Sequence, residues 1–289
     1  MKFSVIMLSH GRAHYTARSL RQLASAGLRD TELVLVDDGT PDTSVQEAIN
    51  SFRRDYPDAA VKTIRYEKSV GAVKGRNDAV LAAEGEYVAL LDNDCMPRTR
   101  AWLDELKATF ERHPEAGIAA PRLVYPLSHK ENKPIIQCAG CIVAVSGRVG
   151  YRGRGEPADA AHFAAEETLQ AVISACWLTP RRLWLDIGGM DEAYSPYHFE
   201  DIDYCYAVRS RGLEVWYVPS VEMYHFENVT SVDLSLGGYA ALTARKSQIF
   251  RKKWEQALTE EKAPPPTAVT WQKNVPLVRL EDKPALELI

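Results

Sequence analysis

Short apolar runs alternate with segments of helical periodicity over residues 3–91, and this alternation constrains the fold more than any other feature. Apolar runs at Phe3–Leu8, Leu33–Val36, Val61–Tyr66 and Tyr87–Leu91 predict strands. Segments 14–26, 43–56 and 75–83 between them predict helices. Because these strands are apolar on both faces, helices must cover both sides of a parallel sheet, so we predict the α/β class.

The pattern becomes irregular after residue 120. Strands are predicted near 135–145, 172–179 and 214–218, with helices near 181–187 and 200–211. We expect this half to form a smaller mixed sheet that abuts the first. A helix is predicted over 239–258, within a C-terminal helical segment at 236–260. Ala263-Pro-Pro-Pro266 predicts an extended, mobile tail over 261–289.

Composition excludes several classes of protein. The chain has 289 residues, of which 46% are hydrophobic and 26% charged, as in ordinary globular proteins. Its longest apolar runs are about five residues, against about 20 needed to cross a bilayer. The net charge of −4 disfavours general binding to nucleic-acid backbones.

Five cysteines indicate a reducing compartment. An odd number in a long chain with no signal-peptide pattern favours free thiols, and we expect a cytoplasmic location. Cys138 and Cys141 have the spacing of half a zinc site, but a second Cys or His pair with matching spacing is missing. The five are Cys95, Cys138, Cys141, Cys176 and Cys205.

Polar residues follow three of the four predicted parallel strands. They are segments 9–12, 37–40 and 92–94. The carboxyl ends of parallel strands meet at one edge of a sheet, where ligands bind. We therefore predict one shared polar crevice at this edge.

Asp92-Asn93-Asp94 is the most informative motif. Alternate residues of an extended segment face the same side about 6.6 Å apart. At that spacing two carboxylates repel by roughly 2.8 kcal/mol at an effective dielectric of about 20. A divalent cation would convert the repulsion to attraction, and oxygen ligands favour Mg²⁺ or Mn²⁺. The alternative is a solvated turn at a strand end.

Two further segments supply charged groups near the same edge. Asp38 precedes Gly39, which permits a tight turn close to a ligand, and the alternative is a turn cap. Arg76 lies near the start of a predicted helix, where a cation does not favour helix stability. An acidic or anionic neighbour would explain its place.

The acids Glu200, Asp201 and Asp203 begin a predicted helix. The alternative is that these acids only stabilise the helix, because acids in the first turn complement the helix dipole. This alternative is strongest for Asp203. Glu200 and Asp201 project differently, so at least one can point into a cleft as a general base. His225 can ligate a metal through a neutral imidazole or can be structural.

Taken together, the motifs resemble the family 2 glycosyltransferases of the GT-A fold. No single motif is decisive, but the set runs in the family's order over about residues 3–226. The matching segments are 5–9, 36–39, 71–77, 91–94, 188–192, 200–203 and His225. The resemblance implies a mostly parallel, Rossmann-like sheet with the smaller mixed sheet and a C-terminal helix.

The resemblance also implies an activity and a site. The activity is inverting transfer of a sugar from a nucleoside diphosphate sugar to an acceptor hydroxyl, with Mn²⁺ or Mg²⁺ as cofactor. Asp201 would be the catalytic base, with Glu200 as the reserve candidate. Metal binding would fall to Asp94 and His225 together with Asp92. Nucleotide-sugar contacts would come from Leu8, Ser9, His10, Asp38, Arg76, Asp92 and Asn93.

Residues 1–120 would form the half that binds the nucleotide sugar, and 121–235 the acceptor-binding and catalytic half of the same domain. The acceptor can be a glycan, a lipid-linked molecule, a protein or a small molecule. The alternatives are a retaining GT-A glycosyltransferase, and a non-catalytic module that binds nucleotide sugars. Failure to release nucleoside diphosphate with any acceptor would favour the second.

Two expectations concern the second half. The predicted helix 239–258 carries basic and apolar residues that can lie on anionic lipid at the inner membrane surface, and the alternative is packing against the catalytic domain. Trp177 precedes the acidic helix start and can present an aromatic face to the acceptor. The alternative is a core tryptophan.

Overall fold

The computed structural model describes residues 1–126, 134–227, 236–261, 264, 279–282 and 286–289. Within them, one sheet has the strand order β10-β12-β6-β11-β4-β1-β2-β3. The last four are the parallel strands expected from the apolar runs. They are β1 (Phe3–Ser9), β2 (Thr31–Asp37), β3 (Ala60–Arg65) and β4 (Tyr87–Asp92). The predicted α/β class is confirmed.

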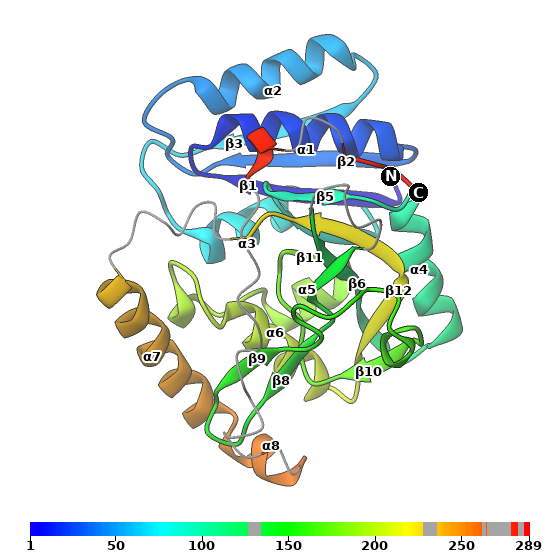
Figure 1. The fold of residues 1–289 in the computed structure, drawn as a ribbon. Coiled ribbons are helices and arrows are strands. Elements are labelled where there is room, and N and C mark those ends of the chain that lie inside the picture. Colours follow the sequence, from blue (N-terminus) through cyan, green and yellow to red (C-terminus); the bar gives the residue numbers. More distant parts are fainter. Residues whose placement is uncertain (127–133, 228–235, 262–263, 265–278, 283–285) are drawn as a thin grey trace.

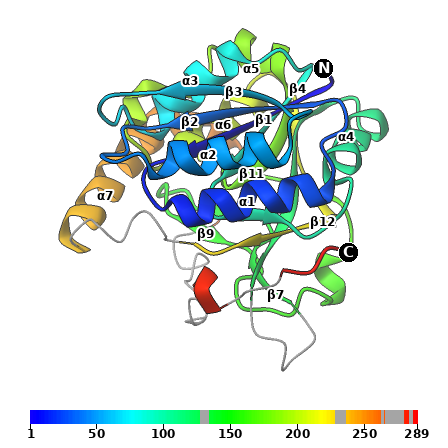
Figure 2. The same ribbon diagram turned by 90° about the horizontal axis from the view of Figure 1, so that it is seen from above.

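Helices cover both faces of the parallel strands. Helices α1 (Ala13–Ala26) and α2 (Ser44–Asp55) lie side by side on one face, and α3 (Ala72–Ala82) lies on the other (Figure 1; Figure 2). Every residue of β2 is buried between these layers. This two-sided burial is why the strand sequences are continuously apolar.

The mixed strands continue the main sheet instead of forming a separate one. Strand β11 (Cys176–Pro180) pairs antiparallel with β4, and β6 (Ala116–Tyr125) lies between β11 and β12 (Glu214–His225). Residue 120 lies inside β6, so a single strand crosses the boundary that we expected between the two functional halves. The short members are β5 (Cys95–Pro97), β7 (Ile135–Cys138) and β10 (Glu167–Leu169).

A separate two-stranded sheet pairs β8 (Cys141–Val143) with β9 (Val149–Tyr151). The expected strand at 135–145 is therefore two strands, β7 and β8, in different sheets. The remaining elements are α4 (Trp102–Arg112), which contacts β6 and β12, α5 (Arg181–Ile187), α6 (Glu200–Arg209), η1 (Ala161–Phe163) and η2 (Glu192–Tyr194). All five cysteines are buried and free, as expected.

The predicted C-terminal helix is two helices, α7 (Leu236–Lys253) and α8 (Glu255–Glu260). One side of α7 packs on the domain. Phe250 is fully buried against Phe199 and Tyr206, and Lys246 Nζ donates to the carbonyls of Ala193 and Ser195 at 2.7 Å each. This side of α7 therefore packs against the domain, which was the alternative to membrane contact.

Two described parts of the tail also contact the domain, which corrects the expectation of a mobile tail for them. Ile289 exchanges backbone hydrogen bonds with Arg98 and Arg100, and the Leu280 amide donates to the Tyr15 hydroxyl. Leu280 belongs to η5 (Leu280–Asp282). The segments 262–263 and 265–278 lie outside the described residues. Across the described chain, none of the helices has the length and apolar character that crossing a bilayer requires.

Candidate functional site

Four elements that are distant in sequence bring together polar side chains at the strand ends, where we expected the shared site. Asp92 ends β4 and Asp94 follows it, while His225 ends β12. Arg76 projects from α3, and Glu200 and Asp201 begin α6. The six side chains are linked by the contacts described below.

Strand pairing brings His225 to the two aspartates. β5 pairs antiparallel with β12, with Cys95 opposite His225, so the residue after Asp94 fixes the end of β12 beside it. His225 Nε2 lies 3.6 Å from Asp94 Oδ1. One ligand atom from each of Asp92, Asp94 and His225 lies within 4.8 Å of the others. Three donor groups at this spacing fit a divalent cation, and the two carboxylates are ligands that suit Mn²⁺ or Mg²⁺.

The charges in this cluster favour a cation. Burial raises the pKa of Asp92, the neighbouring Asp94 adds to that effect, and Arg76 opposes it. Burial alone would lower the pKa of His225, but the charge of Asp94 and its hydrogen bond outweigh burial and raise the pKa to about 10. The carboxylates of Asp92 and Asp94 therefore favour positive charge at this point, where a metal ion would be held.

Arg76 links the aspartates to the acids of α6. Its Nη2 donates to Asp92 Oδ1 at 2.5 Å, and its Nη1 donates to Ser174 Oγ at 2.8 Å and to Glu200 Oε1 at 3.2 Å. The Arg76 side chain is only 9% exposed. These acidic neighbours explain a cation near the start of α3.

The two candidate bases differ in their surroundings. Glu200 is 5% exposed, and its Oε2 has no hydrogen-bond partner among the described residues. Burial and the charge of Asp201 raise the pKa of Glu200 to about 8, against the effect of Arg76. Asp201 is only partly buried, and accepts from the amides of Ile202 at 2.8 Å and Ser174 at 3.3 Å. These amides fix the orientation of its carboxylate, and burial raises its pKa.

Asp38 holds the loop that leads into α3. Its carboxylate accepts from Ser69 Oγ at 2.6 Å and from the amides of Val70 at 2.7 Å and Gly71 at 3.1 Å. Gly71 has φ +87°, and an added Cβ would lie 2.7 Å from Pro196. A side chain is therefore excluded at this point, where the loop contacts the segment before Glu200.

Four predicted nucleotide-contacting residues lie at the ends of β1 and β4. His10 is exposed, with Nδ1 2.6 Å from the Asp38 carbonyl oxygen, and Leu8 is half-buried. Ser9 and Asn93 are buried, and both side chains hydrogen-bond to Thr16 Oγ1. Ser9 and Asn93 therefore join the ends of β1 and β4 to α1 through Thr16, and His10 is the exposed member of the group.

Trp177 lies in the core and not in the cluster. Its side chain is fully buried and stacks on Tyr204, with ring centroids 5.8 Å apart. No ring face is open to an acceptor, which corrects that expectation. Its place on β11, between β4 and β6, explains the burial.

Sequence reasoning missed several residues that complete the site. Ser174 contacts both Arg76 and Asp201, and Gln137 contacts His225 Nδ1 at 3.2 Å. Neither residue lies in a motif: Gln137 belongs to the short strand β7, and Ser174 lies in the turn before β11, so no local signal marks them.

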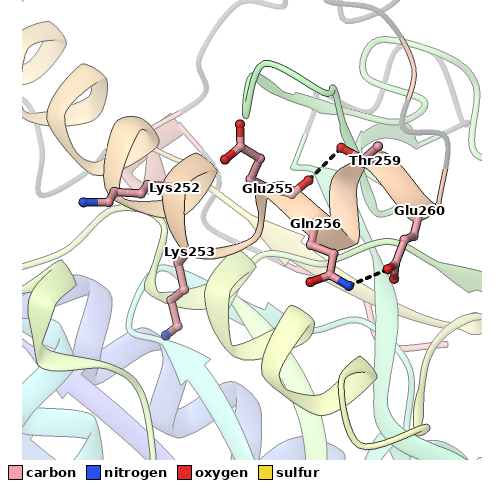
Figure 3. Close-up of a pocket in the computed structure, with 6 residues that line it drawn as sticks. All are labelled: Lys252, Lys253, Glu255, Gln256, Thr259 and Glu260. Atoms are coloured by element: carbon pink, nitrogen blue, oxygen red, sulfur yellow. Dashed lines mark hydrogen bonds between the residues drawn. The ribbon is translucent and has the colours of Figure 1, made fainter.

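A pocket of about 540 Å³ lies elsewhere, where α7 meets α8 (Figure 3). Side chains of those two helices line it. Within α8, Gln256 donates a hydrogen bond to Glu260, and Thr259 donates one to the Glu255 carbonyl. None of the clustered acids lines it. The pocket-lining residues are Lys252, Lys253, Glu255, Gln256, Thr259 and Glu260.

Comparison with known proteins identifies relatives over most of the chain. An uncharacterised protein, y4gI, of Sinorhizobium fredii is 27% identical over 228 residues, which cover 78% of this chain and 24% of that protein. The pre-mycofactocin glycosyltransferase of Mycobacterium tuberculosis is 28% identical over 209 residues, or 72% of this chain and 40% of that one. The chain thus spans less than half the length of these curated relatives.

Solved structures share the fold at low identity. GalNAc-T7, solved with UDP, GalNAc and Mn²⁺, has a TM-score of 0.64 at 14% identity, over 91% of this chain and 55% of that one. The mannosyltransferase PcManGT of Pyrobaculum calidifontis, solved with GDP-Man and Mn²⁺, has a TM-score of 0.61 at 16% identity, over 92% and 66%. The model of glycosyl transferase family 2 matches residues 4–165, more than half of the chain. With its GT-A fold and this match, the chain belongs to glycosyl transferase family 2.

Proposed function

We propose that this chain transfers a sugar from a nucleoside diphosphate sugar to an acceptor hydroxyl, with inversion and with Mn²⁺ or Mg²⁺ as cofactor. The observation that carries the proposal is the grouping of Asp92, Asp94 and His225, joined through Arg76 to Glu200 and Asp201. One cluster thus offers a cation site beside a candidate base. Fold neighbours solved with UDP or GDP-Man and Mn²⁺, and glycosyltransferase relatives, support the same reading.

The donor's diphosphate end would lie beside Asp92 and Asp94. Bound there by these aspartates and His225, Mn²⁺ or Mg²⁺ would offset the negative charge that develops on the leaving diphosphate. His10 and the loop held by Asp38 would contact the nucleoside, because His10 is the exposed group there. Leu8, Ser9 and Asn93 would support those contacts from beneath.

Asp201 would act as the base. It is more exposed than Glu200, and its carboxylate is held in place by two amides. In the reaction the acceptor oxygen forms a bond to the anomeric carbon, the bond from that carbon to the diphosphate oxygen breaks, and the acceptor proton moves to Asp201. A single displacement of this kind inverts the anomeric centre.

Glu200 would stay beside Arg76. Its raised pKa favours a neutral carboxyl at moderate pH, which suits a positioning role better than that of an ionised base. The division of labour between residues 1–120 and 121–235, a cytoplasmic location and membrane contact by the exposed side of α7 stay predictions.

The experiment is a thermal-shift screen of UDP- and GDP-sugars with Mn²⁺ and with Mg²⁺, because a ligand that binds only the folded chain raises its apparent stability. The donor found is then offered with acceptor pools, and the anomeric configuration of the product is read by NMR. Asp201→Asn should lose at least about 100-fold in turnover and still bind donor. A retained configuration, or an active Asp201→Asn with an inactive Glu200→Gln, would contradict the assignment.

A further inference from the structure

A chain of buried polar groups leads from His225 away from the aspartates. His225 Nδ1 lies 3.2 Å from Gln137 Oε1, and Gln137 Nε2 donates to Glu227 Oε1 at 3.3 Å. Gln137 is fully buried on β7. Glu227, two residues beyond His225, has φ +57°, a left-handed conformation that is uncommon outside glycine.

The far end of this chain is fixed by charge. Arg154 donates to both carboxylate oxygens of Glu227, at 2.7 and 2.9 Å, and the Tyr125 hydroxyl donates to it at 3.0 Å. The guanidinium also lies over the rings of Tyr125 and Tyr151, at 5.6 and 5.7 Å from their centroids. One guanidinium that donates to both oxygens is the usual partner of a carboxylate, so Arg154 fixes Glu227 in place as an acceptor.

An ionised carboxylate sets the direction of every bond in the chain. Glu227 can only accept, so the amide group that faces it must be the Gln137 NH₂. The Gln137 oxygen then faces His225 and can only accept, so His225 must carry a proton on Nδ1. The lone pair of a neutral imidazole is thereby placed on Nε2, the atom that lies 3.6 Å from Asp94 Oδ1.

We propose that Gln137 and Glu227 are positioning residues that hold His225 with Nε2 directed at the Asp92–Asp94 carboxylates, as a ready metal ligand. The inference rests on the proposed cation site and goes beyond it. Histidine ligands of metals commonly donate their second ring proton to an oxygen acceptor, and loss of that acceptor weakens metal binding. Here the acceptor is an amide whose orientation is set by a carboxylate on the far side.

The test is the Mn²⁺ dissociation constant of the purified full chain, measured by the EPR signal of free Mn²⁺. Gln137→Leu should weaken Mn²⁺ binding by about tenfold or more, because Nδ1 loses its acceptor. Gln137→Met, which keeps a longer unbranched side chain, is the second variant should Gln137→Leu lose its fold. The matched control is Gln170→Leu, since Gln170 bonds to Val143 and Glu261, away from the cluster.

A rescue separates positioning from packing. The double variant Gln137→Glu with Glu227→Gln exchanges the amide and the carboxylate. An oxygen at position 137 still faces His225 Nδ1, and the amide at position 227 can donate to the other oxygen, so most of the Mn²⁺ affinity should return. In a His225→Ala background, Gln137→Leu should cost no further affinity, because the residue acts only through the imidazole.

The outcomes distinguish this inference from the site on which it rests. If Asp94→Ala abolishes Mn²⁺ binding while Gln137→Leu binds like wild type, the positioning role is wrong and the metal site stands. An equal loss for Gln137→Leu with and without His225 would show a packing effect and also overturn it. No saturable binding by the wild-type chain would contradict both proposals.

Discussion

Arg76 Nη1 lies 3.2 Å from Glu200 Oε1, a contact that joins α3 of the parallel half to α6 of the mixed half. The same guanidinium donates to Asp92 at 2.5 Å. One buried cation therefore contacts acidic side chains of both halves, and the pKa of Arg76 is raised because the charges of the neighbouring acids outweigh its burial. Arg76 thus links an acid of the parallel half to an acid of the mixed half.

Replacing Arg76 should disturb both sides at once. Arg76→Met leaves Asp92 and Glu200 without their cation and should lower the free energy of unfolding by about 3 kcal/mol. Arg76→Lys keeps the charge but cannot reach both acids and Ser174, so donor turnover should fall by about tenfold or more. Urea unfolding and nucleoside diphosphate release measure the two effects. The exposed Arg53→Lys is the control, and an Arg76→Met chain as stable as wild type would contradict the account.

Glu200 predicts a pH dependence of stability. Its pKa is raised from 4.5 to about 8 in the folded chain, so between these values the folded state holds a proton that the unfolded state has released. Stability attributable to Glu200 is therefore present below about pH 4.5 and is lost as the pH rises through about 8. Glu200→Gln keeps the neutral form, so it should match wild type near pH 5 and gain on the order of 2 kcal/mol relative to it near pH 9. Urea unfolding at both pH values measures this, and a constant difference would refute the assignment.

Asp203 has a structural role at the other end of the acidic motif. Its side chain is 3% exposed and accepts from Tyr194 at 2.9 Å, Lys253 at 2.8 Å and Trp254 at 2.7 Å. Asp203→Ala should lower the free energy of unfolding by about 3 kcal/mol and loosen α7 from the domain. Urea unfolding, with hydrogen exchange on α7, provides the measurement. Asp186→Ala, at an exposed pair with Arg182, should cost less than about 1 kcal/mol, and equal costs for the two would contradict this structural role of Asp203.

Trp177 should behave as a core residue. Trp177→Ala removes a fully buried ring and should cost about 3–5 kcal/mol in urea unfolding, with the acceptor KM of the folded fraction unchanged. The half-exposed Trp216, which stacks on His113, should cost less when replaced by Ala. A raised acceptor KM in a Trp177→Ala chain of normal stability would restore the acceptor role.

The parallel half could be predicted because its strands are buried on both faces and read as continuous apolar runs, as Leu33–Val36 does. Strand β6 was not predicted, and β12 was predicted only as far as Val218. β6 begins Ala-Gly-Ile-Ala-Ala-Pro, which has little β-propensity, and β12 continues past Pro219 through a register shift between Val218 and Glu222 to reach His225. Tertiary pairing overrides the sequence signal in both.

At the site, too, local sequence patterns predict some features, and tertiary pairing determines the others. Asp92 and Asp94 could be paired from their spacing on one strand end. Their meeting with His225 depends on β5 pairing with β12, which no local pattern reports, and only the family resemblance indicated it. Gln137 and Ser174 belong to no motif and became visible only in the folded chain.

The most direct test of the central claim is calorimetric titration of the wild-type chain and its Asp94→Ala and Asp201→Asn variants with UDP and GDP, with and without Mn²⁺. The account predicts saturable binding of one nucleotide by the wild type only when Mn²⁺ is present. It also predicts loss of that binding in Asp94→Ala and wild-type binding in Asp201→Asn, because the base lies outside the cation site. Nucleotide binding that is unchanged by removing Mn²⁺ or by Asp94→Ala would contradict it.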